Sequence, residues 1–184
     1  KIITIMKNNL SCGAFDSKFE ALSAEGNTLD GLNVHFGLID EYHAHPTAEV
    51  FNVIDTGTGA RRQPLIWIIT TAGFDPYSPC RSMRDYAERV LRGIEADDSF
   101  FAYIACIDEG DDWMNPDVWI KANPNLGVSV KMDDLERLAG RAAAMPSQQN
   151  DFLVKRMNVW TNQEKRWLDL KTWDKNEGYV SEDE

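Results

Sequence analysis

Two acidic residues directly follow an apolar run in the first quarter of the chain. Residues 34–39 (VHFGLI) are mostly apolar, and Asp40 and Glu41 come next. A strand that ends in adjacent carboxylates carries them into the crevice above a parallel sheet, where ligands bind. Nucleotide hydrolysis needs one carboxylate near Mg²⁺ and a second beside the attacking water. We expect Asp40 to bind the metal through a water and Glu41 to polarise the attacking water. An acidic pair that only begins a solvated loop would give the same pattern.

Small and hydroxyl-bearing residues follow the next apolar run in the same way. Residues 65–69 (LIWII) lead into Thr70, Thr71, Ala72 and Gly73. Such residues let the backbone approach a ligand closely and can exchange hydrogen bonds when a phosphate is lost. A tight turn after a strand would use the same residue types. The occurrence of both features after neighbouring predicted strands favours a shared site.

Two histidines follow the acidic pair and suggest an alternative function. Asp40, His43 and His45 are residue types that bind zinc or manganese. On this reading the protein is a metal-dependent hydrolase. The spacing matches no common hydrolase signature, and a polar loop after the acidic pair accounts for the histidines equally well.

The elements that must position these residues alternate between strand and helix. Apolar runs predict strands, and Thr47 and the Ser78-Pro79 pair predict helix starts. The predicted strands are residues 19–23, 34–39, 65–70 and 101–107, and the predicted helices are residues 48–55 and 79–93. Alternation of this kind predicts an α/β fold with a parallel sheet and flanking helices.

The character of the chain changes near Asp108, from strand-rich to helical. Asn115-Pro116 predicts a helix start, and apolar residues at helical spacing predict two further helices within residues 135–157, interrupted at Pro146. We therefore expect a first domain at residues 1–108 and a mainly helical region at residues 109–184. Three tryptophans in the tail need a surface on which to pack: Trp160, Trp167 and Trp173.

The amino-acid composition of the chain argues against several classes of protein. The 19 basic and 30 acidic residues give a net charge of −11, which argues against an autonomous DNA-binding module. The three cysteines, at positions 12, 80 and 106, have no CxxC spacing, so we expect neither a disulfide framework nor a zinc ribbon. No apolar run approaches the ~20 residues that a membrane helix needs. We expect a cytoplasmic protein that does not interact with membranes.

The combined motifs resemble the large subunit of phage terminases. The stretches that carry the resemblance are, in chain order, ALSAEGNTLDGLN (21–33), GLIDEYHAH (37–45), TTAG (70–73), WIKANPNLG (119–127) and FLVKRMNVW (152–160). Most of the chain is covered, and the set is far more specific than any one motif.

The resemblance implies a motor that uses ATP and Mg²⁺ to move double-stranded viral DNA into procapsids in the bacterial cytoplasm. It implies an ATPase domain of the additional-strand, catalytic-glutamate class of P-loop NTPases and a nuclease domain of the RNase H-like class. Asp40-Glu41 would be the Walker B pair, with Glu41 catalytic, and residues 70–73 the coupling motif. The region after Ile107 would be a lid or linker. The terminase small subunit and the portal would be partners.

The chain departs from the family pattern in two places. No G-x-x-x-x-G-K-[ST] sequence occurs in it, and the nuclease carboxylates are expected beyond the Trp167 to Trp173 region. We therefore expect a piece of a longer protein that neither binds ATP tightly nor hydrolyses it alone. The alternative is a non-catalytic prophage remnant or interaction module that self-associates, because an orphaned sheet edge is adhesive.

Overall fold

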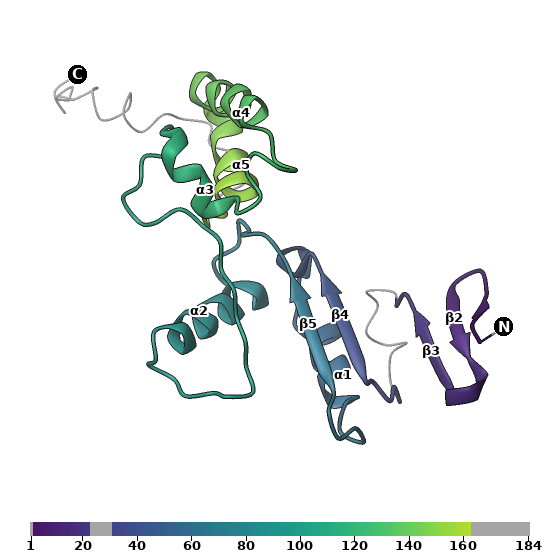
Figure 1. The fold of residues 1–184 in the computed structure, drawn as a ribbon. Coiled ribbons are helices and arrows are strands. Elements are labelled where there is room, and N and C mark those ends of the chain that lie inside the picture. The colour runs from purple at the N-terminus through teal and green to yellow at the C-terminus, as the bar shows by residue number, and fades with distance from the viewer. Residues whose placement is uncertain (1, 23–30, 163–184) are drawn as a thin grey trace, which may run out of the picture. The chain divides into compact units, whose positions relative to one another are not determined.

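Residues 2–22 and 31–162 are described by the computed structural model, which has a mixed α/β fold with a small parallel sheet and several helices (Figure 1). They divide into two compact units. One contains residues 2–22, 31–39 and 47–68, and the other contains residues 40–46 and 69–162. These units are defined by compactness, so the domain boundary expected near Asp108 stays a prediction.

The first unit begins with an antiparallel sheet, of which the sequence predicted only one strand. Strands β1 (Thr4–Ile5), β2 (Asn9–Cys12) and β3 (Ser17–Glu20) lie in the order β1-β2-β3, and Leu10 of β2 faces Phe19 of β3. The strand expected at residues 19–23 therefore lies earlier in the chain, and its last predicted residue is outside the described residues.

A parallel pair of strands follows, joined by a helix. Strands β4 (Phe36–Asp40) and β5 (Leu65–Ile69) are neighbours in one sheet and run in the same direction, with α1 (Glu49–Thr56) between them in the chain (Figure 1). All three elements confirm predictions to within two residues. Ile39 and Ile54 are buried in this arrangement.

The two faces of this sheet differ in burial. Gly37 of β4 lies against α1, where a side chain has no room. The alternate positions are large apolar residues with about half of their surface exposed: Phe36, Leu38, Leu65, Trp67 and Ile69. Successive side chains of a strand point to opposite faces of the sheet. One group of side chains therefore faces α1, and the described residues leave the apolar group on the other face uncovered.

Replacing Gly37 by alanine is expected to lower the free energy of unfolding by about 1–3 kcal/mol, because overpacking forces buried groups to shift. The new Cβ would lie 2.6 Å from Cγ2 of Ile54, which is buried. Gly140, in helix α4 (Met132–Ala144), is the matched control, since a Cβ there meets nothing within 4 Å. Gly140→Ala should instead stabilise by about 0.5–1 kcal/mol. Urea unfolding of both variants tests this, and equal effects would contradict the packing at Gly37.

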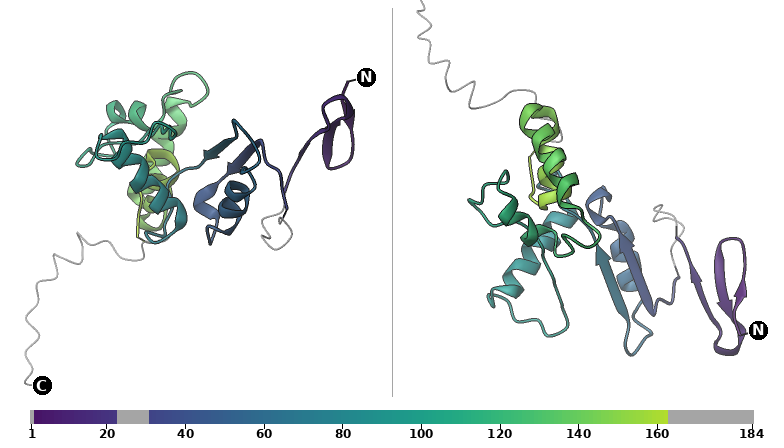
Figure 2. Two further views of the ribbon diagram at one scale, coloured as in Figure 1. Left: turned by 90° about the horizontal axis from the view of Figure 1, so that it is seen from below. Right: turned by 45° about the horizontal axis from the view of Figure 1, so that its top comes forward.

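The second unit is mainly helical (Figure 2). Helix α2 (Pro79–Leu91) begins as predicted, because the Ser78 hydroxyl accepts a hydrogen bond from the Arg81 N–H and proline occupies the first turn. The later elements are η4 (Pro116–Val118), α3 (Trp119–Ala122), α4 and α5 (Pro146–Met157). Asn115 caps η4, and Pro146 starts α5. No helix of the described part of the chain has the length and apolar character needed to cross a membrane.

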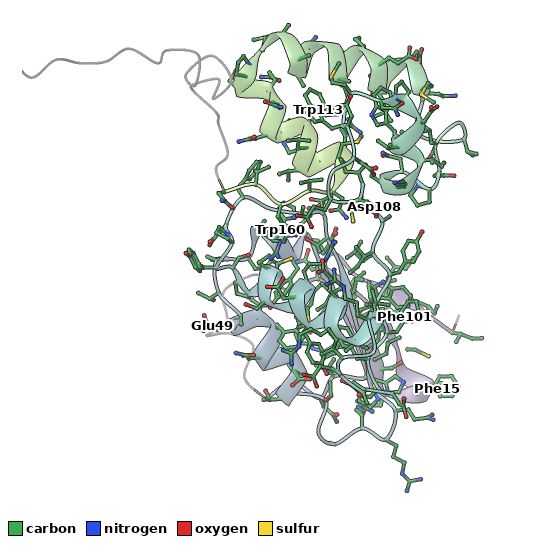
Figure 3. The ribbon with its side chains drawn as sticks, turned by 90° about the vertical axis from the view of Figure 1, so that its left-hand side faces the viewer. Phe15, Glu49, Phe101, Asp108, Trp113 and Trp160 are labelled. Atoms are coloured by element: carbon green, nitrogen blue, oxygen red, sulfur yellow. The ribbon has the colours of Figure 1, made fainter. Side chains whose placement is uncertain are left out.

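Helices α3, α4 and α5 enclose the core of this unit. Trp119 and Leu135 are fully buried, and Phe152 of α5 packs edge-on against Trp119 and tilted against Trp113. Figure 3 shows Trp113 among these helices. The Trp119 indole N–H donates to the Trp113 carbonyl at 2.8 Å, so the indole's polar group is satisfied inside the apolar cluster.

The strand predicted at residues 101–107 does not form, and this expectation was wrong. The segment has no regular secondary structure. Phe101, labelled in Figure 3, is 82% exposed. Tyr103 is 73% exposed, and of this segment only Ile107 belongs to the helical core. An apolar run becomes a strand only beside a neighbour that completes its hydrogen bonds, and the described residues place none beside this segment. The parallel sheet thus has two strands in the described residues.

Candidate functional site

The acidic pair lies at the end of β4, as predicted, with an unusual backbone conformation. Asp40 is the last residue of the strand, and Glu41 is left-handed, with φ at 50°. A non-glycine residue with positive φ is uncommon, and it often marks a functional turn. The Asp40 Oδ1 atom accepts the Glu41 N–H at 2.9 Å, which stabilises this turn.

A short 3-10 helix, η3 (Tyr42–Ala44), anchors the turn. Tyr42 is buried, and burial raises the pKa of its phenol. The Ala44 N–H donates to the Glu41 carbonyl at 2.8 Å. The Glu41 side chain remains 61% exposed, so its carboxylate is accessible to water. The local structure thus holds the backbone of Glu41 fixed while leaving its carboxylate in solvent.

His43 joins the two predicted motifs. Its backbone N–H donates to Thr70 Oγ1 at 2.9 Å, and its Nδ1 atom lies 3.1 Å from that hydroxyl. The same Nδ1 atom lies 3.4 Å from Thr71 Oγ1 and 3.2 Å from Glu41 Oε2. The structure therefore brings Glu41, Thr70 and Thr71 together around one imidazole. The sequence singled out His43 only as a possible metal ligand, and nothing in its spacing indicated this linking position.

Thr70 also connects to helix α2. Cys80 Sγ lies 3.7 Å from the Thr70 hydroxyl, which in turn donates to the Thr71 carbonyl at 2.9 Å. Burial raises the pKa of the Cys80 thiol. The thiol is therefore protonated at neutral pH and acts here as a weak donor rather than as a nucleophile.

Ala72 and Gly73 are tied to the segment after α5. The Ala72 N–H donates to Asn158 Oδ1 at 2.6 Å, and the Asn158 amide donates to the Ala105 carbonyl at 2.8 Å. A Cβ on Gly73 would lie 3.0 Å from Trp160 and 3.3 Å from the His43 side chain. Gly73 thus permits a close approach, as its residue type suggested, and the group that approaches it is Trp160.

Trp160 packs against Gly73 and Arg81, as expected for a tryptophan that needs a packing surface. The guanidinium of Arg81 lies over the indole, 5.6 Å from the ring centroid, and the Thr161 N–H donates to the Gly73 carbonyl at 3.4 Å. Trp167 and Trp173 lie outside the described residues.

Asn158→Ala is expected to lower the free energy of unfolding by about 2–4 kcal/mol, because it removes both hydrogen bonds and leaves alanine in a left-handed conformation. Asn158 has φ at 55°. Asn158→Gly loses the same bonds but adopts this conformation freely, so its cost should be about 1–2 kcal/mol smaller. Urea unfolding of the two variants separates the cost of the lost hydrogen bonds from the cost of the left-handed conformation. A cost for alanine no larger than that for glycine would contradict the left-handed conformation.

A cleft of about 510 Å³ opens beside Glu41. Its lining comes from Glu41, His43 and Thr71 and from residues of α4 and α5. The residues contributed by the helical region are Leu138, Arg141, Gln148, Asp151, Phe152, Lys155 and Arg156. Asp40 does not line the cleft. The cationic residues were not identified from the sequence, because they lie on two helices whose packing only the structure provides.

The described residues do not support a transition-metal site. Within residues 2–22 and 31–162, no group of three or more His, Cys, Asp or Glu side chains is arranged to hold a metal ion. The His45 ring packs edge-on against Tyr42, with centroids 5.4 Å apart. The metal-dependent hydrolase based on Asp40, His43 and His45 therefore gains no structural support.

Comparison with known families matches nearly the whole chain in two blocks. The model described as "Terminase large subunit, ATPase domain" matches residues 1–89. The model described as "Terminase large subunit, endonuclease domain" matches residues 94–182. The first block contains both predicted motifs, and the second contains α4 and α5.

Curated relatives and a solved structure give the same result. The chain is 41% identical over 144 residues to protein YmfN of Escherichia coli (strain K12), covering 78% of the chain and 32% of that relative. It is 26% identical over 159 residues to the large subunit of the terminase of Enterobacteria phage HK97, covering 85% of the chain and 31% of that relative. The crystal structure of the HK97 large terminase superposes with a TM-score of 0.73 at 25% identity, covering 86% of the chain and 33% of that structure. The chain thus spans about a third of the length of these relatives.

Proposed function

Because this chain belongs to the terminase large subunit family, we propose that its complete protein hydrolyses ATP at Glu41 and uses the energy to move viral DNA into procapsids. The observation that carries the proposal is the contact network in which His43 joins Glu41 to Thr70 and Thr71. This network connects a carboxylate suited to activating water with the motif expected to respond when the phosphate is lost.

Glu41 would act as the general base. Its carboxylate is exposed and next to a cleft, where an attacking water could be oriented and deprotonated in the transition state. His43 lies 3.2 Å from Glu41 Oε2. With its proton on Nδ1, the imidazole would attract the carboxylate and favour one orientation of it. A fixed base is the requirement for efficient proton transfer.

Asp40 would hold Mg²⁺ through a water, and the ion would neutralise charge on the nucleotide phosphates. The residues fit this task in part. Asp40 is exposed, and one of its carboxylate oxygens is engaged by the Glu41 N–H, which leaves the other for a metal-bound water. Magnesium keeps several of its waters in proteins, so one carboxylate in the outer shell suffices.

Residues 70–73 would couple hydrolysis to movement. A change in the position of Glu41 reaches Thr70 and Thr71 through His43. From there it reaches the end of α5 through the Ala72 hydrogen bond to Asn158. The 3.2 Å contact between Glu41 and His43 and the hydrogen bonds that follow it would give hydrolysis a physical connection to the helical region.

We assign residues 1–108 to an ATPase domain of the additional-strand, catalytic-glutamate type and residues 109–184 to a lid or linker. The Walker A loop would come from another part of the complete protein, since the 184 residues contain no G-x-x-x-x-G-K-[ST] sequence. This chain by itself should therefore show negligible hydrolysis. Double-stranded DNA, the small subunit and the portal would be partners of the complete protein in the bacterial cytoplasm.

The decisive test is ATP hydrolysis by the complete protein before and after the Glu41 carboxylate is removed. Hydrolysis that depends on this carboxylate supports the proposal. Turnover that persists without it would assign catalysis to another residue.

One face of the parallel sheet is left uncovered by residues 2–22 and 31–162, and this favours a second candidate, in which this chain is a self-associating interaction module. Phe36, Leu38, Leu65, Trp67 and Ile69 expose contiguous apolar surface of a kind that marks interaction sites. The expected result is a dimer or larger species in light scattering, shifted towards monomer by Trp67→Ser. A monodisperse monomer at high concentration would contradict this candidate.

A further inference from the structure

Three cationic side chains line the cleft beside Glu41. Arg141 belongs to α4, and Lys155 and Arg156 belong to α5. Lys155 forms an ion pair with Asp151 at 2.7 Å. Among the described residues, no carboxylate lies within ion-pair distance of Arg141 or Arg156. The cleft thus contains two guanidinium groups that have no carboxylate partner among the described residues.

Arginines without a carboxylate partner in residues 2–22 and 31–162 are unexpected in a chain with 30 acidic and 19 basic residues. Of the residues that line the cleft, three are cations and two, Glu41 and Asp151, are carboxylates, so the lining carries one net positive charge with His43 neutral. The chain as a whole carries −11. The cleft therefore favours an anion although the whole protein repels one.

The donors around the cleft suit a phosphate group. A guanidinium offers planar, paired N–H donors that match phosphate oxygens. Lys155 lines the same cleft and, although paired with Asp151, adds a third cationic group. Leu138 and Phe152 contribute apolar surface to the lining.

We propose that Arg141 and Arg156 bind a phosphate group, that of a nucleotide's end or the inorganic phosphate released from it. The identity of the ligand as a nucleotide's phosphate rests on the proposed function, whereas phosphate binding by the cleft rests on the geometry alone. Duplex DNA fits less well, because the site is a concave cleft and the whole chain is strongly acidic.

This site would join the two halves of the chain chemically. Glu41 and Thr71 lie in the block matched by the ATPase-domain model, and Arg141 and Arg156 lie in the block matched by the endonuclease-domain model. A phosphate held between them links α4 and α5 to the residues around His43 directly. Loss of that phosphate would remove the link.

The test is calorimetric titration of the 184-residue chain with tripolyphosphate and with inorganic phosphate. We expect saturable binding that is weakened at least about tenfold by the double variant Arg141→Gln/Arg156→Gln. The charge-retaining variant Arg141→Lys/Arg156→Lys should keep part of the affinity, because lysine binds phosphate as a point charge. Arg137→Gln is the matched control, since Arg137 lies on the same helix, outside the cleft, and pairs with Asp134. Circular dichroism confirms that each variant is folded.

Three results would overturn the proposal: no saturable binding of either ligand up to about 10 mM, equal affinity in the glutamine double variant, or a duplex oligonucleotide bound through these arginines while tripolyphosphate is not. Failure of the proposed function is recognised separately, by hydrolysis that survives loss of the Glu41 carboxylate in the complete protein. Phosphate binding that remains sensitive to Arg141 and Arg156 would then still hold.

Discussion

Glu41→Gln in the complete protein is expected to lower kcat for ATP hydrolysis by about 10³-fold, because an amide cannot accept the proton of the attacking water. The Kd for ATP should stay within about threefold of the original value, since a general base acts mainly in the transition state. Glutamine has nearly the same size and shape, and its amide oxygen can keep the contact that Glu41 Oε2 makes with His43 Nδ1. Phosphate release and nucleotide binding, measured side by side, give the two quantities.

Glu109→Gln is the matched control for this change. Glu109 is exposed, lies in the acidic turn after Ile107 and does not line the cleft. Its replacement removes the same charge and should leave kcat unchanged. Turnover in Glu41→Gln within about threefold of the original value would remove Glu41 from the catalytic role.

Thr70→Val is expected to lower the amount of DNA moved per ATP hydrolysed. The substitution removes the hydroxyl that accepts the His43 N–H at 2.9 Å and nearly preserves the side chain's shape. DNA packaged per ATP consumed should fall by about tenfold or more, in the range of coupling energies between linked sites. Hydrolysis itself should be reduced much less, because Glu41 keeps its carboxylate. Protection of packaged DNA from nuclease, divided by the phosphate released, measures the coupling.

Two further variants delimit this prediction. Thr70→Ser keeps the hydroxyl and should restore most of the coupling. Thr58→Val removes a hydroxyl that donates to the Asp55 carbonyl at 2.7 Å, remote from the network in the chain, and should leave coupling intact. A valine variant in which hydrolysis and packaging fall in equal proportion would identify Thr70 as part of the catalytic machinery instead.

The elements that the sequence predicted correctly depend on local signals. Helix α2 begins where a serine cap precedes proline, a pattern that acts within one turn. Strands β4 and β5 are short apolar runs that become neighbours through the short connection containing α1. That proximity is why Glu41 and the loop after β5 could be expected at one site.

The features that could not be predicted depend on tertiary structure. Residues 101–107 are apolar and β-branched enough for a strand, but a strand also needs a neighbour with free backbone groups. His43 acquires its linking position only when the turn at Glu41 and the loop after β5 are in place. Arg141 and Arg156 meet at the cleft because α4 and α5 pack together, and their sequence separation indicates nothing of this.

In the proposed function, Asp40 and Glu41 form the acidic half of an ATP site that a Walker A loop from outside these 184 residues completes. Calorimetry with ATP and Mg²⁺ tests it most directly, on this chain alone and after addition of a separately expressed N-terminal segment that carries a Walker A loop. Tight binding is expected only when both parts are present, and it should depend on Mg²⁺ and on the Asp40 carboxylate. Absence of tight ATP binding in the mixture as well as in the separate parts would contradict it and favour a structural role.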